Sequence, residues 1–262
     1  MNKTLSIRKT FLLLFATFTL SAFTQPHVIA HRGYWKVESS AQNSIVSLMK
    51  ADSINIFGSE VDIWLSSDGI PMVNHDAELE LNGTKLVVQD TPAAILQSVK
   101  LSNGEKLPTL EEYLNAFEKC THIKLIIELK THRTKEQEKE LVQKVTKMIK
   151  DRALQKKVEY ISFGVNLIEQ VLKNDPTAKV YYLNGDLSPQ EITKMGAGGI
   201  DYHYSVFYKN PDWITSAHAL GQKINVWTVN KPEDIQKMID LHVDFITTDE
   251  PLLVLEILQN QK

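Results

Sequence analysis

The sequence has little cysteine and no concentration of positive charge. Cys120 is the only cysteine among 262 residues, so the chain cannot form an internal disulfide, and a metal site built from several thiolates is excluded. The net charge is −3, and lysine and arginine occur without a long basic run. Since a nucleic-acid groove would carry a basic stripe, we expect no nucleic-acid partner.

Long apolar runs are also missing, except at the N-terminus. There, basic residues precede an apolar segment at 11–23, and small residues follow before Gln25. This pattern predicts a secretory signal peptide over residues 1–24, with export to the periplasm and a mature domain over residues 25–262. The apolar segment is short for a membrane span, so we expect no stable span after signal removal. An uncleaved anchor is the less favoured alternative.

Strand-like and helix-like segments alternate through the rest of the chain. The apolar patterns predict eight strands, near residues 27–31, 58–64, 123–129, 158–162, 179–183, 199–203, 223–229 and 243–247. Three helix starts carry the capping-box spacing, namely Thr109 with Glu112, Ser188 with Glu191, and Asn230 with Glu233. Eight strands alternating with helices in a chain of this length favour an α/β fold with a parallel (β/α)8 barrel. An open doubly wound sheet is the alternative.

One stretch interrupts the alternation after the second strand. Residues 66–69, Ser-Ser-Asp-Gly, form a turn signal between two β-like runs, which predicts a hairpin that brings His75 back roughly opposite Glu60. Residues 76–108 then lack strong helical periodicity, and we interpret them as a small inserted lobe that ends before the helix beginning at Thr109. Insertions after barrel strands lie on the catalytic face.

Three carboxylates stand inside apolar strand segments. Glu60 and Asp62 are two residues apart, so their side chains share one face, and Glu128 follows Leu-Ile-Ile in a later strand. Carboxylates in such places are costly unless they are paired. An all-oxygen set prefers a hard cation, and we therefore predict one divalent ion, Mg²⁺ or Ca²⁺.

Four further polar residues accompany these carboxylates. His31 and His75 are candidates for general acid/base catalysis, because histidine accepts and donates protons near neutral pH. Arg32 is able to clamp phosphate oxygens if the chain turns at Gly33. Lys130 lies two residues beyond Glu128 on the same face, where it either accompanies a phosphate or balances the carboxylates. This set suits metal-assisted chemistry on a phosphodiester.

Trp227 ends a predicted strand in the sequence Asn-Val-Trp-Thr-Val. Two interpretations are equally favoured: the side chain packs within the barrel, or it stacks against a glycerol-like part of a substrate.

The ordered set of motifs resembles the glycerophosphodiester phosphodiesterase family. The motifs are His-Arg-Gly at 31–33, Glu-Val-Asp at 60–62, Asp-Gly at 68–69 before His-Asp at 75–76, Leu-Pro-Thr-Leu-Glu-Glu at 107–112, Glu-Leu-Lys at 128–130, Ser-Phe at 162–163, Val-Trp-Thr-Val-Asn at 226–230 and Ile-Thr-Thr-Asp-Glu-Pro at 246–251. Each motif is weak alone, but their order is specific, and they cover essentially all of the chain after the predicted signal.

The resemblance implies a distorted TIM barrel of the phospholipase-C-like phosphodiesterase type that hydrolyses glycerophosphodiesters to sn-glycerol 3-phosphate and an alcohol. The mechanism that the resemblance implies is attack by the substrate's own glycerol hydroxyl, which gives a cyclic phosphate that water then opens. The implied roles are acid/base catalysis for His31 and His75, metal binding for Glu60, Asp62 and Glu128, substrate binding at the phosphate for Arg32 and Lys130, and substrate binding at the glycerol for Trp227.

One departure from the family pattern affects the expected site. The family usually has Glu-Asn-Thr after His-Arg-Gly, whereas this chain has Gln42-Asn43-Ser44. An amide in place of a carboxylate changes the local charge by one unit, so metal affinity or head-group preference is expected to differ. Two alternatives stay open, a phosphatidylinositol-type phospholipase or lyase on the same barrel and a glycerophosphodiester-binding protein without turnover.

Overall fold

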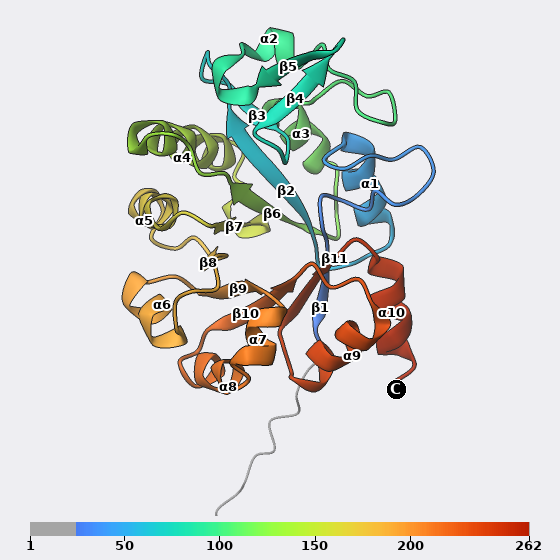
Figure 1. Ribbon diagram of the computed structural model, residues 1–262, viewed down its shortest axis with the longest axis vertical. Coiled ribbons are helices and arrows are strands. Elements are labelled where there is room, and N and C mark those ends of the chain that lie inside the picture. The colour runs from blue at the N-terminus through green and yellow to red at the C-terminus, as the bar shows by residue number, and fades with distance from the viewer. Residues whose placement is uncertain (1–24, 262) are drawn as a thin grey trace, which may run out of the picture.

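The computed structural model describes residues 25–261, so the predicted signal peptide lies outside the described part. Within that part, eight parallel strands close into a barrel, because β1 pairs with both β11 and β2 (Figure 1). The ring consists of β1 (His27–Ala30), β2 (Gly58–Leu65), β6 (Lys124–Leu129), β7 (Val158–Ser162), β8 (Val180–Tyr182), β9 (Gly199–His203), β10 (Lys223–Trp227) and β11 (Phe245–Thr248). The predicted barrel is confirmed, and the open-sheet alternative is wrong.

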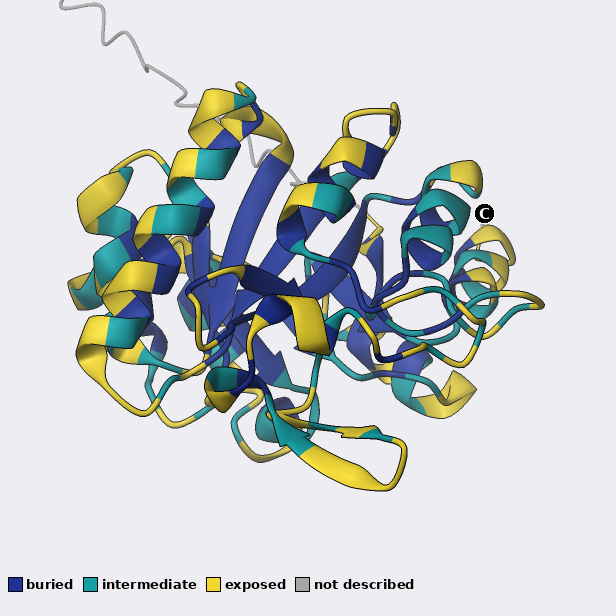
Figure 2. Ribbon diagram, turned by 90° about the horizontal axis from the view of Figure 1, so that it is seen from above, coloured by how far each residue is buried: buried dark blue, intermediate teal, exposed yellow. Residues whose placement is uncertain are grey.

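Helices follow the strands and cover the outside of the ring (Figure 1). They are α1 (Ile45–Ser53), α3 (Leu110–Phe117), α4 (Lys135–Asp151), α5 (Val165–Asn174), α6 (Pro189–Met195), α7 (Ser205–Lys209), α8 (Asp212–Ala219), α9 (Pro232–Asp240) and α10 (Pro251–Gln259), with a short 3₁₀ turn η2 (Gln155–Lys157). Apolar helix faces pack on apolar strand residues such as Leu125, Ile127 and Val226, which forms one large core between the two layers. Figure 2 shows the strands buried at the centre and the outer helix faces exposed.

Two of the three predicted capping boxes are confirmed. The Thr109 hydroxyl accepts the Glu112 amide at the start of α3, and the Glu112 carboxylate accepts the Thr109 amide in return. Ser188 and Glu191 repeat this arrangement at α6. The third prediction is wrong, because α9 begins after Lys231 without a side-chain cap.

A lobe projects from the barrel after β2. The strand β3 (Pro71–Val73) pairs antiparallel with β2 outside the ring, as the turn at 66–69 predicts. It is followed by the hairpin β4 (Glu78–Leu81) and β5 (Thr84–Val87), the 3₁₀ turn η1 (Val88–Asp90) and the short helix α2 (Ala93–Leu96). A separate apolar cluster, which includes Trp64, Leu96 and Leu107, holds this lobe against β2.

Across residues 25–261, the structure contains no helix that is both long enough and apolar enough to cross a membrane.

Candidate active site

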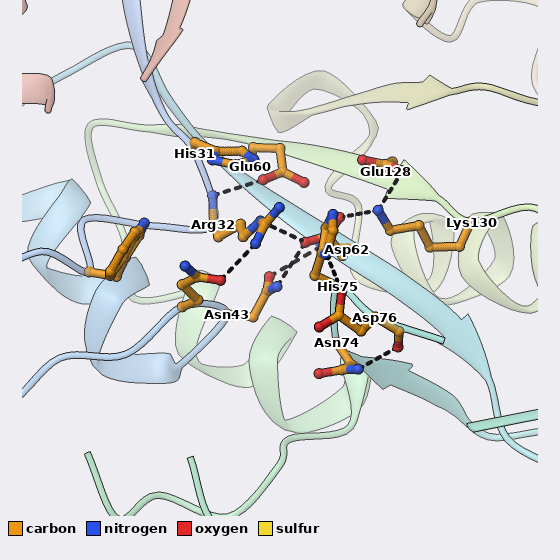
Figure 3. Close-up of polar contacts among 12 residues, drawn as sticks. His31, Arg32, Asn43, Glu60, Asp62, Asn74, His75, Asp76, Glu128 and Lys130 are labelled. Atoms are coloured by element: carbon orange, nitrogen blue, oxygen red, sulfur yellow. Dashed lines mark hydrogen bonds and ion pairs between the residues drawn. The ribbon is translucent and has the colours of Figure 1, made fainter. Parts of the chain in front are cut away.

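The three predicted carboxylates meet on two adjacent strands. Asp62 of β2 pairs in register with Glu128 of β6, and Glu60 lies two residues before Asp62 on the same inward face. One carboxylate oxygen from each residue lies within 4.8 Å of the other two. Glu60 and Asp62 are 2% and 1% exposed, and Glu128 is 8% exposed. Figure 3 shows the three side chains gathered around the same space.

Burial and mutual repulsion make this acidic cluster unfavourable without a cation. Burial raises the pKa of Glu60 well above its usual value, and the charges of Asp62 and Glu128 raise it further. Burial and the charge of Asp62 also raise the pKa of Glu128 to about 8. Within the described part of the chain, the Oε1 atom of Glu60 has no hydrogen-bond partner. Hard oxygen donors with an unsatisfied atom fit a divalent cation.

Lys130 lies between two of the carboxylates. Its Nζ atom is 2.6 Å from Oδ1 of Asp62 and 2.7 Å from Oε1 of Glu128. Burial lowers the pKa of Lys130, but the two carboxylates raise it by more, so the net shift is upward and the ammonium form persists. Lys130 therefore balances the carboxylates directly, which is one of the two roles expected from the sequence.

Arg32 reaches the cluster because the backbone turns sharply after β1. Arg32 and Gly33 have φ angles of 56° and 81°, and a Cβ atom at Gly33 would overlap the side chain of Ser47. In this left-handed turn the Arg32 amide donates to Oε2 of Glu60 at 2.8 Å. The guanidinium Nε lies 3.8 Å from Oδ2 of Asp62. Backbone and side chain of Arg32 thus both face the carboxylates.

Gln42, which departs from the family pattern, and Asn43, which keeps it, hold opposite ends of this arrangement. The Gln42 Oε1 atom accepts a hydrogen bond from Nη1 of Arg32 at 2.7 Å. The Asn43 amide donates to Oδ2 of Asp62 at 2.8 Å, and the Asp62 backbone amide donates back to Oδ1 of Asn43 at 3.3 Å. Gln42 therefore orients Arg32 as a neutral partner, where a glutamate would form a charged one.

His31 is held by a carboxylate from the other end of the chain. Its Nδ1 atom lies 2.8 Å from Oδ1 of Asp249, which also accepts the Trp35 indole N–H at 3.1 Å. The Asn230 amide donates to Oδ2 of Asp249 at 2.8 Å. Although burial raises the pKa of Asp249, these hydrogen bonds and the charge of His31 lower it to about 2. With Nδ1 engaged, Nε2 is the atom of His31 available for proton transfer.

His75 lies at the edge of the lobe, close to the position expected from the sequence. Continuing the pairing of Ile63 with Val73 brings His75 opposite Val61, one residue from Glu60. Its Nδ1 atom lies 2.7 Å from Oδ1 of Asp76. Burial lowers the pKa of His75, while the negative charge of Asp62 acts in the opposite direction. The neutral ring is therefore favoured, as a general base requires.

These residues surround one cavity of about 100 Å³ at the carboxyl ends of the strands. His31, Arg32, Glu60, His75 and Glu128 line one side. The other side consists of Ile161, Phe163, Leu183, Asp201, Trp227, Thr228 and Thr247. The Trp227 ring meets Phe163 edge to face, with 5.7 Å between ring centroids, so it lines the cavity and also packs within the barrel. Each predicted site residue except Asp62 and Lys130 lines the cavity itself, and those two form ion pairs behind it.

Sequence reasoning missed several residues of this site. The motifs contain Asp249 and Asn230 but give no sign of their contact, and hydrogen bonds to the 248–249 segment replace the capping role expected of Asn230. No pattern in the sequence points to Asp201. The partners of these residues are distant in sequence, so only the ordered motifs around Asn230 and Asp249 carried a signal.

The fold and the site together define a phosphodiesterase of the (β/α)8 barrel class. A model of the glycerophosphoryl diester phosphodiesterase family matches residues 31–253, which include every ring strand except β1 and all the site residues described above. The chain therefore belongs to this family, and the predicted enzyme class is confirmed.

Similar proteins agree with this assignment. A glycerophosphodiester phosphodiesterase from Caldanaerobacter subterraneus is 28% identical over 246 residues, covering 88% of this chain and 97% of the relative. The crystal structure of a glycerophosphodiester phosphodiesterase from Parabacteroides distasonis is 44% identical, with a TM-score of 0.87 over 90% of this chain and 98% of the other. A phosphodiesterase from Oleispira antarctica, solved with the product sn-glycerol 3-phosphate, shares the fold at 23% identity, with a TM-score of 0.77 over 90% of this chain and 97% of that one.

Proposed function

We propose that this enzyme hydrolyses glycerophosphodiesters to sn-glycerol 3-phosphate and an alcohol, with one divalent cation held by Glu60, Asp62 and Glu128. The observation that carries the proposal is the meeting of these three buried carboxylates at the small cavity that His31, Glu60 and Glu128 line. The Oleispira antarctica phosphodiesterase of the same fold holds sn-glycerol 3-phosphate, which supports the same product here. The periplasm remains the proposed location, on the evidence of the predicted signal peptide alone.

The cation fits the site for electrostatic reasons. Mg²⁺ or Ca²⁺ bound to the carboxylates would polarise a phosphoryl oxygen and offset the charge that develops on the phosphate. Arg32 is directed to the same place by its hydrogen bond to Gln42, where its guanidinium would bind phosphate oxygens. Lys130 holds Asp62 and Glu128 in position through its two ion pairs.

The two histidines supply the proton transfers. Cleavage of the diester requires that a proton leaves the attacking oxygen and that another reaches the leaving alkoxide. Asp249 fixes the His31 ring through Nδ1, so Nε2 is the atom able to take up and return a proton. The neutral form of His75, favoured by burial, suits removal of the proton from the attacking oxygen, the step that needs a general base. A hydroxyl of the substrate's own glycerol is the proposed nucleophile, which gives a cyclic phosphate that water then opens.

Product identification by ³¹P NMR tests this function against both alternatives. Glycerophosphocholine, glycerophosphoethanolamine, glycerophosphoinositol and glycerophosphoglycerol are incubated with the enzyme and Mg²⁺ or Ca²⁺. We expect sn-glycerol 3-phosphate as the final product. A cyclic phosphate that accumulates without being opened supports the lyase, whereas tight binding without any new phosphorus signal supports the binding protein, and either outcome contradicts the proposal.

A further inference from the structure

A buried carboxyl group faces the cavity from the side that is otherwise mostly apolar. Asp201 of β9 is 1% exposed and lines the cavity, where its neighbours on β7 and after β8 are Ile161 and Leu183. Within residues 25–261, its Oδ1 atom has no hydrogen-bond partner. A buried polar atom without a partner lowers the stability of the folded protein. This side chain is better explained by a ligand than by packing.

The surroundings of Asp201 hold its carboxyl group in place. Asn225 of β10 pairs with Asp201 in register and lies beside its carboxyl group. The Asn225 amide is itself fixed by Thr247, whose Oγ1 atom lies 2.8 Å from Nδ2. The Trp227 indole N–H donates to the backbone oxygen of Asp201 at 2.8 Å. Although Asn225 lowers the pKa of Asp201, burial raises it to about 7. The ring of Trp227 and the carboxyl group are thus positioned together.

Asp201 lies across the barrel from the acidic cluster. In the ring of eight strands, β9 is separated from β2 by three strands in either direction. A ligand whose phosphate lies at Arg32 and Glu60 therefore extends toward β9 when it enters the cavity. The volume of about 100 Å³ suits a three-carbon polyol.

We propose that Asp201 binds the terminal hydroxyl of the glycerol unit, which is the hydroxyl farthest from phosphorus, and so selects glycerol over a three-carbon diol. This inference rests on the proposed function. It assigns the polar half of glycerol recognition to Asp201, while Trp227 and Phe163 cover the carbon atoms. A hydroxyl at that place would satisfy the Oδ1 atom, and a methyl group would leave it unpaired. A site that hydrogen-bonds a substrate hydroxyl discriminates strongly against the analogue lacking it.

A pair of ligands that differ by this one hydroxyl tests the proposal. Calorimetry compares the affinities of glycerol 3-phosphate and propane-1,2-diol 1-phosphate, which keeps the hydroxyl beside the phosphorylated carbon. Steady-state kinetics compares kcat/KM for the corresponding choline diesters. We expect the wild-type enzyme to favour the glycerol compounds by about 10–10²-fold in both measurements. In Asp201→Ala, the preference should fall to less than threefold, chiefly because the affinity and the kcat/KM for the glycerol compounds decrease.

Two further variants separate recognition from damage to the fold. Asp201→Asn keeps a hydrogen-bonding side chain of the same shape and should retain most of the preference. Glu159 is another buried carboxylate, on β7, and it forms ion pairs with Lys124 at 3.1 Å and Lys179 at 3.3 Å. Glu159→Gln should leave the preference for the glycerol compounds unchanged. If Asp201→Ala does not fold, Asp201→Ser takes its place.

The failure of this inference differs visibly from the failure of the proposed function. Equal affinities and equal kcat/KM values of the wild-type enzyme for the two kinds of ligand overturn the role of Asp201. An equal decrease for both kinds in Asp201→Ala overturns it as well. An enzyme that neither binds glycerol 3-phosphate nor cleaves either diester overturns the proposed function, and this inference with it.

Discussion

Oδ1 of Asp249 lies 2.8 Å from Nδ1 of His31, although 218 residues separate them in the sequence. β1 and β11 are neighbours in the closed barrel, so the two ends of the described chain together build the His31 side of the site. A carboxylate at this place fixes the orientation of the ring and leaves Nε2 directed away from it.

Asp249→Asn should lower kcat by about 10–10³-fold and change KM little, because the amide keeps contact with the ring but loses the negative charge. Trp35→Phe is the matched control, since it removes a neutral hydrogen bond to the same Oδ1 atom. We expect less than a tenfold loss there. Similar losses in the two variants would show that Asp249 serves packing rather than proton transfer.

His31→Ala and His75→Ala should each reduce turnover by about 10²–10⁴-fold and leave the folded structure intact. Both side chains line the cavity, and His75 is partly exposed, so their removal leaves no large hole in the core. Steady-state kinetics and circular dichroism on the purified variants provide the measurements. Nearly full activity in either variant would remove that histidine from the proposed pair.

Metal binding by the acidic cluster is open to direct titration. Glu60→Gln should weaken Mg²⁺ or Ca²⁺ binding by at least tenfold in isothermal titration calorimetry, because it removes a charged ligand whose Oε1 atom is otherwise unpaired. An unchanged cation affinity would be inconsistent with Glu60 as a ligand.

The raised pKa of Glu128 links the stability of the cation-free protein to pH. A carboxyl group whose pKa rises to about 8 on folding binds a proton more tightly in the folded state. The stability that this proton binding adds to the folded protein is fully present below the unfolded pKa near 4. It is lost as the pH rises through about 8. Between pH 5 and pH 8.5, the wild-type protein should therefore lose about 1–3 kcal/mol more stability than Glu128→Gln.

Chemical denaturation at the two pH values, in the presence of EDTA, measures this difference. Adding the cation at pH 8.5 should restore stability to the wild-type protein more than to the variant, since a bound cation replaces the missing proton. Parallel pH dependence in the two proteins would show that Glu128 does not carry the linkage.

Gln42→Glu restores the carboxylate usual in the family and tests the effect of the departure. The new charge would lie beside Arg32 and near the acidic cluster, so cation affinity should rise by about 3–30-fold while phosphate binding weakens. Gln42→Ala removes the hydrogen bond without adding charge, and we expect its cation affinity to stay close to that of the wild type. Equal cation affinities in all three proteins would place Gln42 outside the electrostatics of the site.

The alternation of apolar runs was sufficient to predict the eight ring strands, since each forms a buried segment bounded by turn residues. The spacing of Glu60 and Asp62 was likewise sufficient to place both on one face, because side chains alternate along a strand. The register that sets Glu128 beside Asp62 and the contact of His31 with Asp249 arise from closure of the barrel. Local patterns contain no such information, and Asp201 was missed because an isolated carboxylate in a strand has no local signature.

The release of glycerol 3-phosphate from glycerophosphodiesters, measured without added ions, with EDTA, and after Mg²⁺ or Ca²⁺ is returned, tests the central claim most directly. We expect that EDTA abolishes release, that one of the two ions restores it in the wild-type enzyme, and that Glu60→Gln recovers only at much higher ion concentrations. Full release in EDTA by a protein shown to be free of bound metal would contradict it.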